Sequence, residues 1–160
     1  MAIIAFGADH AGYPLKQILI EHVTQAGHTV IDHGTSSTES VDYPAFCSAA
    51  ARSVRDGDAD LGIVLGGSGQ GEQLAANKVR GVRAALCNCL YTARMAREHN
   101  DANVCAIGAR QHSLEETFAL IDVFISTPFS GDERHARRIG QIRHYEDTDE
   151  VPATGTDYRA

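Results

Sequence analysis

The feature that most constrains the fold is an alternation of two hydrophobic periods along the chain. Short apolar runs with β-branched residues alternate with stretches in which apolar residues recur at helical spacing. The five runs cover Ala2 to Phe6, Thr29 to Ile31, Leu61 to Leu65, Val82 to Leu86 and Val104 to Ile107. Strands connected in this way form right-handed βαβ crossovers. The sequence therefore predicts an α/β fold with a five-stranded parallel sheet covered by helices on both faces.

The length of the chain suits a single domain. With 160 residues and 43% apolar content, the chain can fill one core of two or three layers. Leu114 to Ile125 and Gly131 to Tyr145 continue the helical pattern, and the second of these stretches carries several arginines. After Val151 the chain is rich in Pro, Gly, Thr and Asp and has almost nothing to bury. We expect residues 1–150 to form one domain and residues 151–160 to be a flexible tail.

Charge and cysteine content narrow the class of protein. Lys and Arg number 14 and Asp and Glu 21, which gives a net charge of −7 and argues against nucleic acid or an anionic membrane as a partner. The N-terminal stretch lacks the charged start of a signal peptide, and no apolar run approaches the ~20 residues of a membrane span. The 4 cysteines show no disulfide spacing. We therefore expect a soluble, cytoplasmic protein with reduced thiols.

Polar side chains follow the predicted strands at the points where the strands end. Asp9 and His10 follow the first strand, Tyr43 lies after the second, and Arg110 follows the fifth. Ligands of open parallel sheets bind outside the carboxyl ends of the strands, where these residues would converge. Taken singly, Asp9 and Asp42 are equally well explained as turn or helix-cap residues.

A glycine-rich loop, Gly66 to Gly71, follows the third strand, and Glu72 comes next, at the start of a helix. The loop departs from both nucleotide-binding patterns at this position, because a dinucleotide fingerprint needs glycine there and a P-loop needs lysine. A carboxylate in that place repels phosphate. The N–H groups of the loop can instead hold an oxygen that gains charge during a reaction, with Glu72 as the base that removes a proton next to a carbonyl group. The alternative is an ordinary first-turn acid that stabilises its helix.

Two arginines and a histidine lie far from this loop in the sequence. Arg134 and Arg138 are four residues apart and share one helical face, an arrangement that suits a phosphate group. A solvated face paired with Asp132 and Glu133 explains them as well. His99 ends a predicted helix before the fifth strand, where it is as easily a helix cap as a catalyst.

Six segments of the sequence resemble the type B ribose-5-phosphate isomerases, within a family that also contains galactose-6-phosphate isomerase subunits. They are GADHAGY at 7–13, DYP at 42–44, GGSGQGEQLAANK at 66–78, REHNDANV at 97–104, IGAR at 107–110 and ERHARRI at 133–139. The resemblance runs from about Ala2 to Tyr145 with matching spacing. It implies a Rossmann-like three-layer α/β/α sandwich. It also implies an enzyme that interconverts ribose 5-phosphate and ribulose 5-phosphate through an enediolate, without a metal or another cofactor.

The resemblance also implies roles for individual residues. Asp9 and His99 match the pair that opens the sugar ring, and Ser68 with the amides of residues 69–71 matches the anion hole. Many members carry a catalytic cysteine directly before the glycine loop, where this chain has Gly66. The chain is similar instead to the branch whose base is the loop glutamate, here Glu72. The substrate-binding positions are matched by His10, Tyr43, Gly67, Gly69, Gln70, Gly71, Asn100, Arg110, Arg134 and Arg138.

Three functions stay open at this point. The first is the isomerisation of ribose 5-phosphate with Glu72 as the base. The second is the isomerisation of another sugar phosphate, with four or six carbons, because the resemblance does not fix the substrate. The third is a sugar-phosphate-binding protein without turnover, although a carboxylate beside the bound anion weakens binding and therefore favours an enzyme.

The positions of His99 and Asn100 predict how the protein assembles. The other matched residues that follow strands share the carboxyl edge of the sheet, whereas a helix that returns the chain to a parallel strand ends at the amino edge. We therefore expect a homodimer, or a higher oligomer, in which His99 and Asn100 of one chain complete the site of its partner. The sequence leaves open which subunit supplies Arg134 and Arg138.

Overall fold

The computed structural model describes residues 1–158, in which strands and helices alternate as the sequence predicts. The one clear difference is in β4, which starts at Ala84 rather than at Val82, because Val82 N donates a hydrogen bond to Val79 O in the preceding turn. The elements are β1 (Ile3–Ala8), α1 (Tyr13–Gln25), β2 (Thr29–Asp32), α2 (Tyr43–Asp56), β3 (Leu61–Gly66), α3 (Gln70–Ala76), β4 (Ala84–Leu86), α4 (Leu90–Asn100), β5 (Val104–Gly108), α5 (Leu114–Ser126) and α6 (Glu133–Thr148).

The sheet of the described residues has five strands in the order β2-β1-β3-β5-β4. All neighbouring strands are parallel, which confirms the predicted sheet. Ala8 pairs with Leu65, and Gly66 pairs with Gly108, so β1, β3 and β5 end at the same level. From β1 the chain crosses to β2 on one side of β1. The later strands β3, β5 and β4 all lie on the other side of β1. The crevice at which such a sheet binds its ligand therefore lies between the carboxyl ends of β1 and β3.

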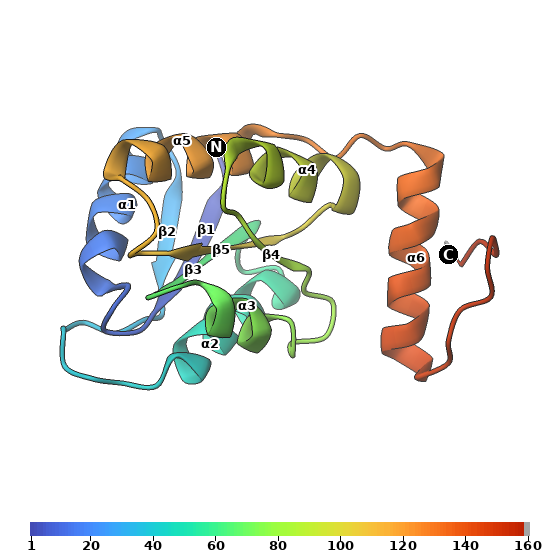
Figure 1. Cartoon of the computed structure of the whole chain (residues 1–160), viewed down its shortest axis with the longest axis horizontal. Helices are drawn as coiled ribbons and strands as arrows, with labels where there is room; N and C mark the ends of the chain where they lie inside the picture. The colour runs from blue at the N-terminus through green and yellow to red at the C-terminus, as the bar shows by residue number, and fades with distance from the viewer. Residues whose placement is uncertain (159–160) are drawn as a thin grey trace.

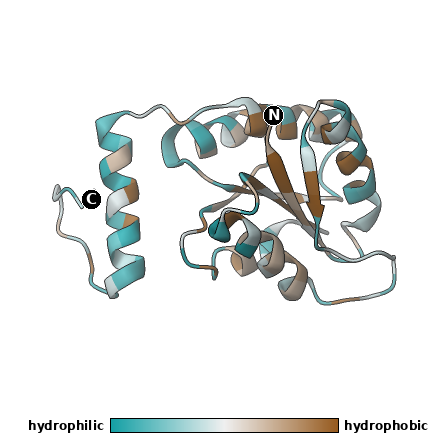
Figure 2. Ribbon diagram, turned by 180° about the vertical axis from the view of Figure 1, so that it is seen from behind, coloured by the Kyte–Doolittle hydropathy of each residue, from teal (hydrophilic) through white to brown (hydrophobic). Residues whose placement is uncertain are grey.

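Helices cover both faces of the sheet, which confirms the three-layer sandwich. Figure 1 shows α1, α4 and α5 on one face and α2 and α3 on the other. Side chains alternate between the two cores along each strand: in β1, Ile4 and Phe6 pack under the first layer and Ala5 under the second. The hydrophobic colour in Figure 2 is concentrated in the strands. Among residues 1–158, no helix has both the length and the apolar run that crossing a bilayer requires.

The helix α6 stands apart from the three layers (Figure 1). Near its start, the ring of His135 packs on the ring of His99 in α4, with 4.2 Å between the ring centroids. Near its end, Glu146 Oε2 accepts a hydrogen bond of 2.8 Å from Gly81 N. Between these contacts, a cleft of about 620 Å³ separates α6 from the edge strand β4, and Ile142 contributes to its apolar lining.

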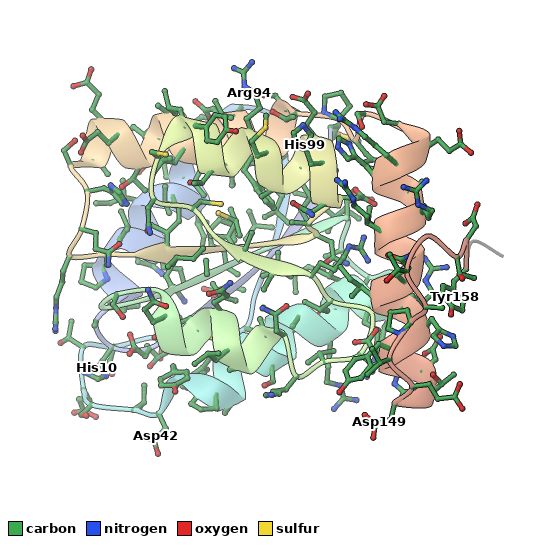
Figure 3. All side chains as sticks on the ribbon, turned by 45° about the vertical axis from the view of Figure 1, so that its right-hand side comes forward. His10, Asp42, Arg94, His99, Asp149 and Tyr158 are labelled. Atoms are coloured by element: carbon green, nitrogen blue, oxygen red, sulfur yellow. The ribbon has the colours of Figure 1, made fainter. Side chains whose placement is uncertain are left out.

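The residues after α6 fold back along this helix. The ring of Tyr158 stacks on His144 at 4.0 Å, and Gln141 Nε2 donates a hydrogen bond of 2.9 Å to Thr156 O. Figure 3 shows Tyr158 beside α6. Residues 159–160 of the predicted tail lie outside the described residues, and the flexibility of the tail stays a prediction.

Candidate active site

Backbone hydrogen bonds hold the glycine loop against the ends of the neighbouring strands. Gly66 O accepts a hydrogen bond of 2.8 Å from Ala109 N, and Gly67 O accepts one of 3.2 Å from Arg110 N. On the other side, Asp9 N donates to Leu65 O at 3.2 Å. The loop therefore lies between Asp9 and Arg110, as expected from the common carboxyl edge.

Two of the loop glycines make room for neighbouring side chains. A Cβ atom at Gly71 would lie 2.7 Å from the hydroxyl oxygen of Tyr43, and one at Gly67 would lie 3.4 Å from Nη1 of Arg110. The first distance is too short for any larger residue without movement of the Tyr43 ring. Tyr43 and Arg110 thus both reach the loop, which confirms that the three groups converge.

The side chain of Glu72 turns inward from the first turn of α3. An ordinary first-turn acid would extend into water, but Glu72 is 4% exposed. Its Oε2 has no hydrogen-bond partner among the described residues. Burial raises the pKa of Glu72 above the usual carboxyl value and the charge of Asp9 raises it further, while the backbone N–H groups of Glu72 and Gly69 lower it in part. A carboxylate with a raised pKa and an unoccupied oxygen is equipped to accept a proton.

The carboxyl group of Glu72 occupies the space that a side chain at position 66 would fill. A Cβ atom built on Gly66 would overlap with Oε1 of Glu72. Glycine at this position is therefore a condition for the inward conformation of Glu72. The thiol of Cys47 also lies in this region, but burial, together with the negative charges of Glu72 and Asp9, raises its pKa far above the usual thiol range, so it stays protonated.

Asp9 and His10 are fixed at the end of β1 by the backbone around them. Asp9 Oδ1 accepts hydrogen bonds of 2.9 and 3.0 Å from the amides of Ala11 and Gly12. These two hydrogen bonds form the turn that was considered for Asp9, and they also fix the orientation of its carboxylate. Asp9 is 7% exposed. His10 Nδ1 lies 3.2 Å from both the amide nitrogen and the carbonyl oxygen of Val41, in the loop that leads to α2.

His99 and Asn100 do not join these residues. They end α4 at the edge where the strands begin, and Asn100 O accepts a hydrogen bond of 3.0 Å from Nε of Arg83, just before β4. Figure 3 shows His99 along the top of the molecule and His10 at the lower left, well apart from each other. The sequence prediction that His99 and Asn100 lie away from the carboxyl edge of their own chain is confirmed.

The arginine-bearing start of α6 lies with His99. The contact between His135 and His99 places the first turn of α6 at the end of α4, and Arg134 directly precedes His135. Arg134 and Arg138 are both exposed. Arg134 Nη2 lies 3.8 Å from Asp132 Oδ2, so the surface pairing considered for it exists, although exposed pairs of this kind contribute little. Both guanidinium groups are thus accessible to a ligand.

The sequence did not single out the side chains that hold these residues in place. His135, which packs on His99, lies within a quoted segment, but its burial followed from no spacing argument. Its position four residues before the buried Ile139 on α6 is the signal that could have identified it. Within residues 1–158, no three His, Cys, Asp or Glu side chains gather as a metal site would require.

The fold and the carboxyl-edge residues define a class of protein: a parallel α/β protein with a glycine loop and a buried carboxylate at the switch point of its sheet. The family described as Ribose/Galactose Isomerase matches residues 4–142. The chain belongs to this family.

Curated relatives and solved structures agree with the family. The chain is 54% identical over 151 residues to ribose-5-phosphate isomerase B of Mycobacterium tuberculosis, and the match covers 93% of each chain. The structure of Clostridium thermocellum ribose-5-phosphate isomerase B superposes with a TM-score of 0.90 at 44% identity, covering 92% of this chain and 99% of the other. The Mycoplasma genitalium enzyme, solved with bound ribulose-5-phosphate, has a TM-score of 0.86 at 39% identity, covering 91% of this chain and 97% of the other.

Proposed function

We propose that this protein is an aldose–ketose isomerase that interconverts ribose 5-phosphate and ribulose 5-phosphate. The observation that carries the proposal is Glu72, a buried carboxylate with a raised pKa and an unpartnered oxygen in a glycine loop. A protein that only binds a sugar phosphate gains nothing from a buried negative charge beside its ligand. Relatives named ribose-5-phosphate isomerase B, one of them solved with ribulose-5-phosphate, support the substrate.

The residues of the site account for the steps of the reaction. Asp9 and His99 transfer the protons that open the ribose ring and free the C1 aldehyde. Glu72 then removes the C2 proton, and the electron pair moves onto the carbonyl to form an enediolate, which the loop amides and Ser68 stabilise. After a proton passes between the two oxygens, Glu72 returns its proton to C1, and the C2 ketone forms.

Binding uses the remaining residues. We assign the phosphate to His10, Arg110, Arg134 and Arg138, because guanidinium groups match phosphate oxygens with two parallel hydrogen bonds. Tyr43 and Asn100 contact the sugar, and the loop residues 67–71 surround its reacting end. No step of this scheme calls for a metal ion.

The separation of the two groups of residues supports a homodimer with shared sites. Because His99 and Asn100 lie at the amino edge and Asp9 lies at the carboxyl edge, one chain cannot bring them together without rearrangement of the sheet. We assign His99 and Asn100 of each site to the partner subunit. The contact of α6 with α4 supports the same assignment for Arg134 and Arg138.

A cytoplasmic location is part of the proposal. Cys47, Cys87 and Cys105 are buried free thiols, and Cys89 is an exposed one. Free thiols of this kind persist in a reducing compartment.

The test of the proposed function is turnover of a panel of aldose phosphates with four, five and six carbons, followed by NMR. We expect ribose 5-phosphate to give ribulose 5-phosphate with the highest kcat/KM, and dialysis against EDTA to leave kcat unchanged. Preference for a four- or six-carbon substrate would replace the assigned substrate. Saturable binding in calorimetry without turnover of any substrate would leave a binding protein in place of an enzyme.

A further inference from the structure

Lys16 is a buried lysine that the proposed mechanism does not use. It lies in the first turn of α1 and is 1% exposed, although lysine is rarely buried unless it is paired. Its Nζ donates hydrogen bonds of 2.7 Å to both carboxylate oxygens of Asp32, the last residue of β2. It also donates to Thr35 O at 2.8 Å and to Gly34 O. An ammonium group has three donors and no acceptor, so these partners use all of its hydrogen bonds.

The partners of Lys16 lie at the start of a long loop, residues 33–42, that connects β2 to α2 (Figure 1). Thr35 N donates a hydrogen bond of 3.1 Å to Ala8 O, at the end of β1. A Cβ atom built on Gly34 would overlap with the backbone nitrogen of Ala8, so the loop runs directly against this strand. Lys16 therefore fixes the loop beside the two site residues that follow β1.

The far end of the same loop contacts the candidate active site. His10 Nδ1 lies 3.2 Å from both the amide nitrogen and the carbonyl oxygen of Val41. Tyr43, the first residue of α2, reaches Gly71 of the glycine loop. Residues 36–40, between the two ends, are mostly exposed and contribute little to holding the loop. The conformation of the loop thus depends on how its ends are fixed.

Little apolar surface holds this loop in place. In its sequence, HGTSSTESVD at 33–42, Val41 is the one apolar residue besides glycine. Beside the ammonium group lies a cleft of about 580 Å³, whose lining includes Gln17, Ser36 and the ring of Tyr13. The first half of the loop therefore depends more on the charge-assisted hydrogen bonds of Lys16 than on packing.

We propose that Lys16 is a positioning residue that clamps the loop to the end of β1 and so holds His10 and Tyr43 where they contact the substrate. Without the ammonium group the loop would sample several conformations. Substrate binding would then have to order it, which weakens affinity. The inference rests on the proposed function, because His10 and Tyr43 are assigned to a bound sugar phosphate only there.

The experiment uses Lys16→Met, which keeps the length of the buried stem but has no donor. We expect KM for ribose 5-phosphate to rise about tenfold while kcat stays within about threefold of wild type, because the base and the glycine loop are unchanged. Hydrogen exchange followed by mass spectrometry should become faster in peptides that cover residues 33–42 and stay unchanged in β3. Lys16→Arg keeps a cation with several donors and should recover part of the lost affinity.

Asp32→Asn is a second, milder variant. It keeps the lysine and removes only the charge of its partner, whose side chain is 38% exposed, so the fold should tolerate it. We expect a smaller rise in KM, about threefold, and faster exchange in the same peptides. Where Lys16→Met does not fold, Asp32→Asn decides the question.

Val23→Ala is the matched control, because Val23 lies on the same helix and is 1% exposed, in the core away from the loop. It should lower the melting temperature and leave KM unchanged. An equal rise of KM in Val23→Ala would mean that lost stability alone explains the effect. Unchanged KM and exchange in the folded Lys16→Met and Asp32→Asn proteins would mean that Lys16 serves only the fold. Either result overturns the inference while turnover by the wild-type protein keeps the proposed function intact. A wild-type protein without turnover would overturn the proposed function itself.

Discussion

The two edges of the sheet are built in different ways. At the carboxyl edge, Asp9, the glycine loop and Arg110 follow directly from strands whose ends are fixed by the register of the sheet. At the amino edge, His99 ends a helix and Arg134 begins another, and α6 stands away from the three layers (Figure 1). In the proposed mechanism, the base and the anion hole therefore belong to the frame of one chain. We assign the ring-opening histidine and the phosphate-binding arginines, which lie on this projecting part, to the site of a second copy of the chain.

The largest expected effect is at the carboxyl edge, in Glu72→Gln. The amide keeps the shape of the side chain but cannot accept the C2 proton, so we expect kcat to fall roughly 10²- to 10⁴-fold with little change in KM. Steady-state kinetics with ribose 5-phosphate measures this. Glu115→Gln is the matched control, because Glu115 is also a first-turn acid, in α5, and should leave kcat unchanged. Near wild-type turnover of Glu72→Gln would remove Glu72 from the role of base.

Gly66→Ala tests the same edge without touching the carboxylate itself. The new methyl group would displace Oε1 of Glu72, which is the end of a flexible side chain, so the fold should tolerate it. We expect kcat to fall about 10²-fold, while the melting temperature changes by a few degrees at most.

Gly62→Ala, on the same strand, is the contrasting variant. Its methyl group would lie 3.0 Å from Cγ2 of Val104 in the core, so we expect lost stability with kcat retained. Equal kcat in the wild type and Gly66→Ala would show that the inward position of Glu72 does not matter for turnover.

The arginines test the amino edge. Arg138→Ala removes an exposed guanidinium group that we assign to the substrate phosphate, and we expect KM for ribose 5-phosphate to rise about tenfold with a smaller change in kcat. Arg143→Ala, which removes an exposed guanidinium group from the opposite side of α6 nearer its end, should leave KM unchanged. Equal effects of the two substitutions would favour the alternative of a solvated charged face.

The smallest expected effect is on stability and its pH dependence. Because the pKa of Glu72 is higher in the folded than in the unfolded state, the folded state binds more protons between the two values, and stability falls as pH rises through that window. Above the ordinary carboxyl pKa, the buried Glu72 side chain is therefore destabilising. We expect Glu72→Gln to melt a few degrees higher than wild type at pH 7, and the difference to shrink as the pH is lowered toward 4. Calorimetry over this range measures it, and a variant that melts lower at pH 7 would contradict the raised pKa.

The fold was predictable from the sequence because its signals are local. β-branched runs and helical spacing identified all five strands, and the parallel arrangement followed from their alternation with helices. The strand order and the separate position of α6 were not predictable, because both depend on contacts between segments far apart in the chain. The start of β4 was placed too early because Val82 has the residue type of a strand but takes part in a turn.

The site was predictable where a residue follows a strand. Asp9, Tyr43 and Arg110 converge on the loop as expected. The inward turn of Glu72 was not visible in the sequence, because it depends on the empty space at Gly66. The location of Arg134 and Arg138 beside His99 depends on a single ring contact between α4 and α6, which no spacing rule contains.

Subunit mixing tests most directly whether each active site combines the carboxyl edge of one chain with the amino edge of its partner. Glu72→Gln and His99→Ala proteins, each inactive alone, are mixed under conditions that exchange subunits, and the heterodimer is verified by native mass spectrometry. In a shared site, one of the two heterodimer sites carries both lesions and the other carries neither. We therefore predict recovery of about a quarter of wild-type activity at statistical exchange. A verified heterodimer that stays inactive would mean that Glu72 and His99 of the same chain work together, and would contradict the shared site.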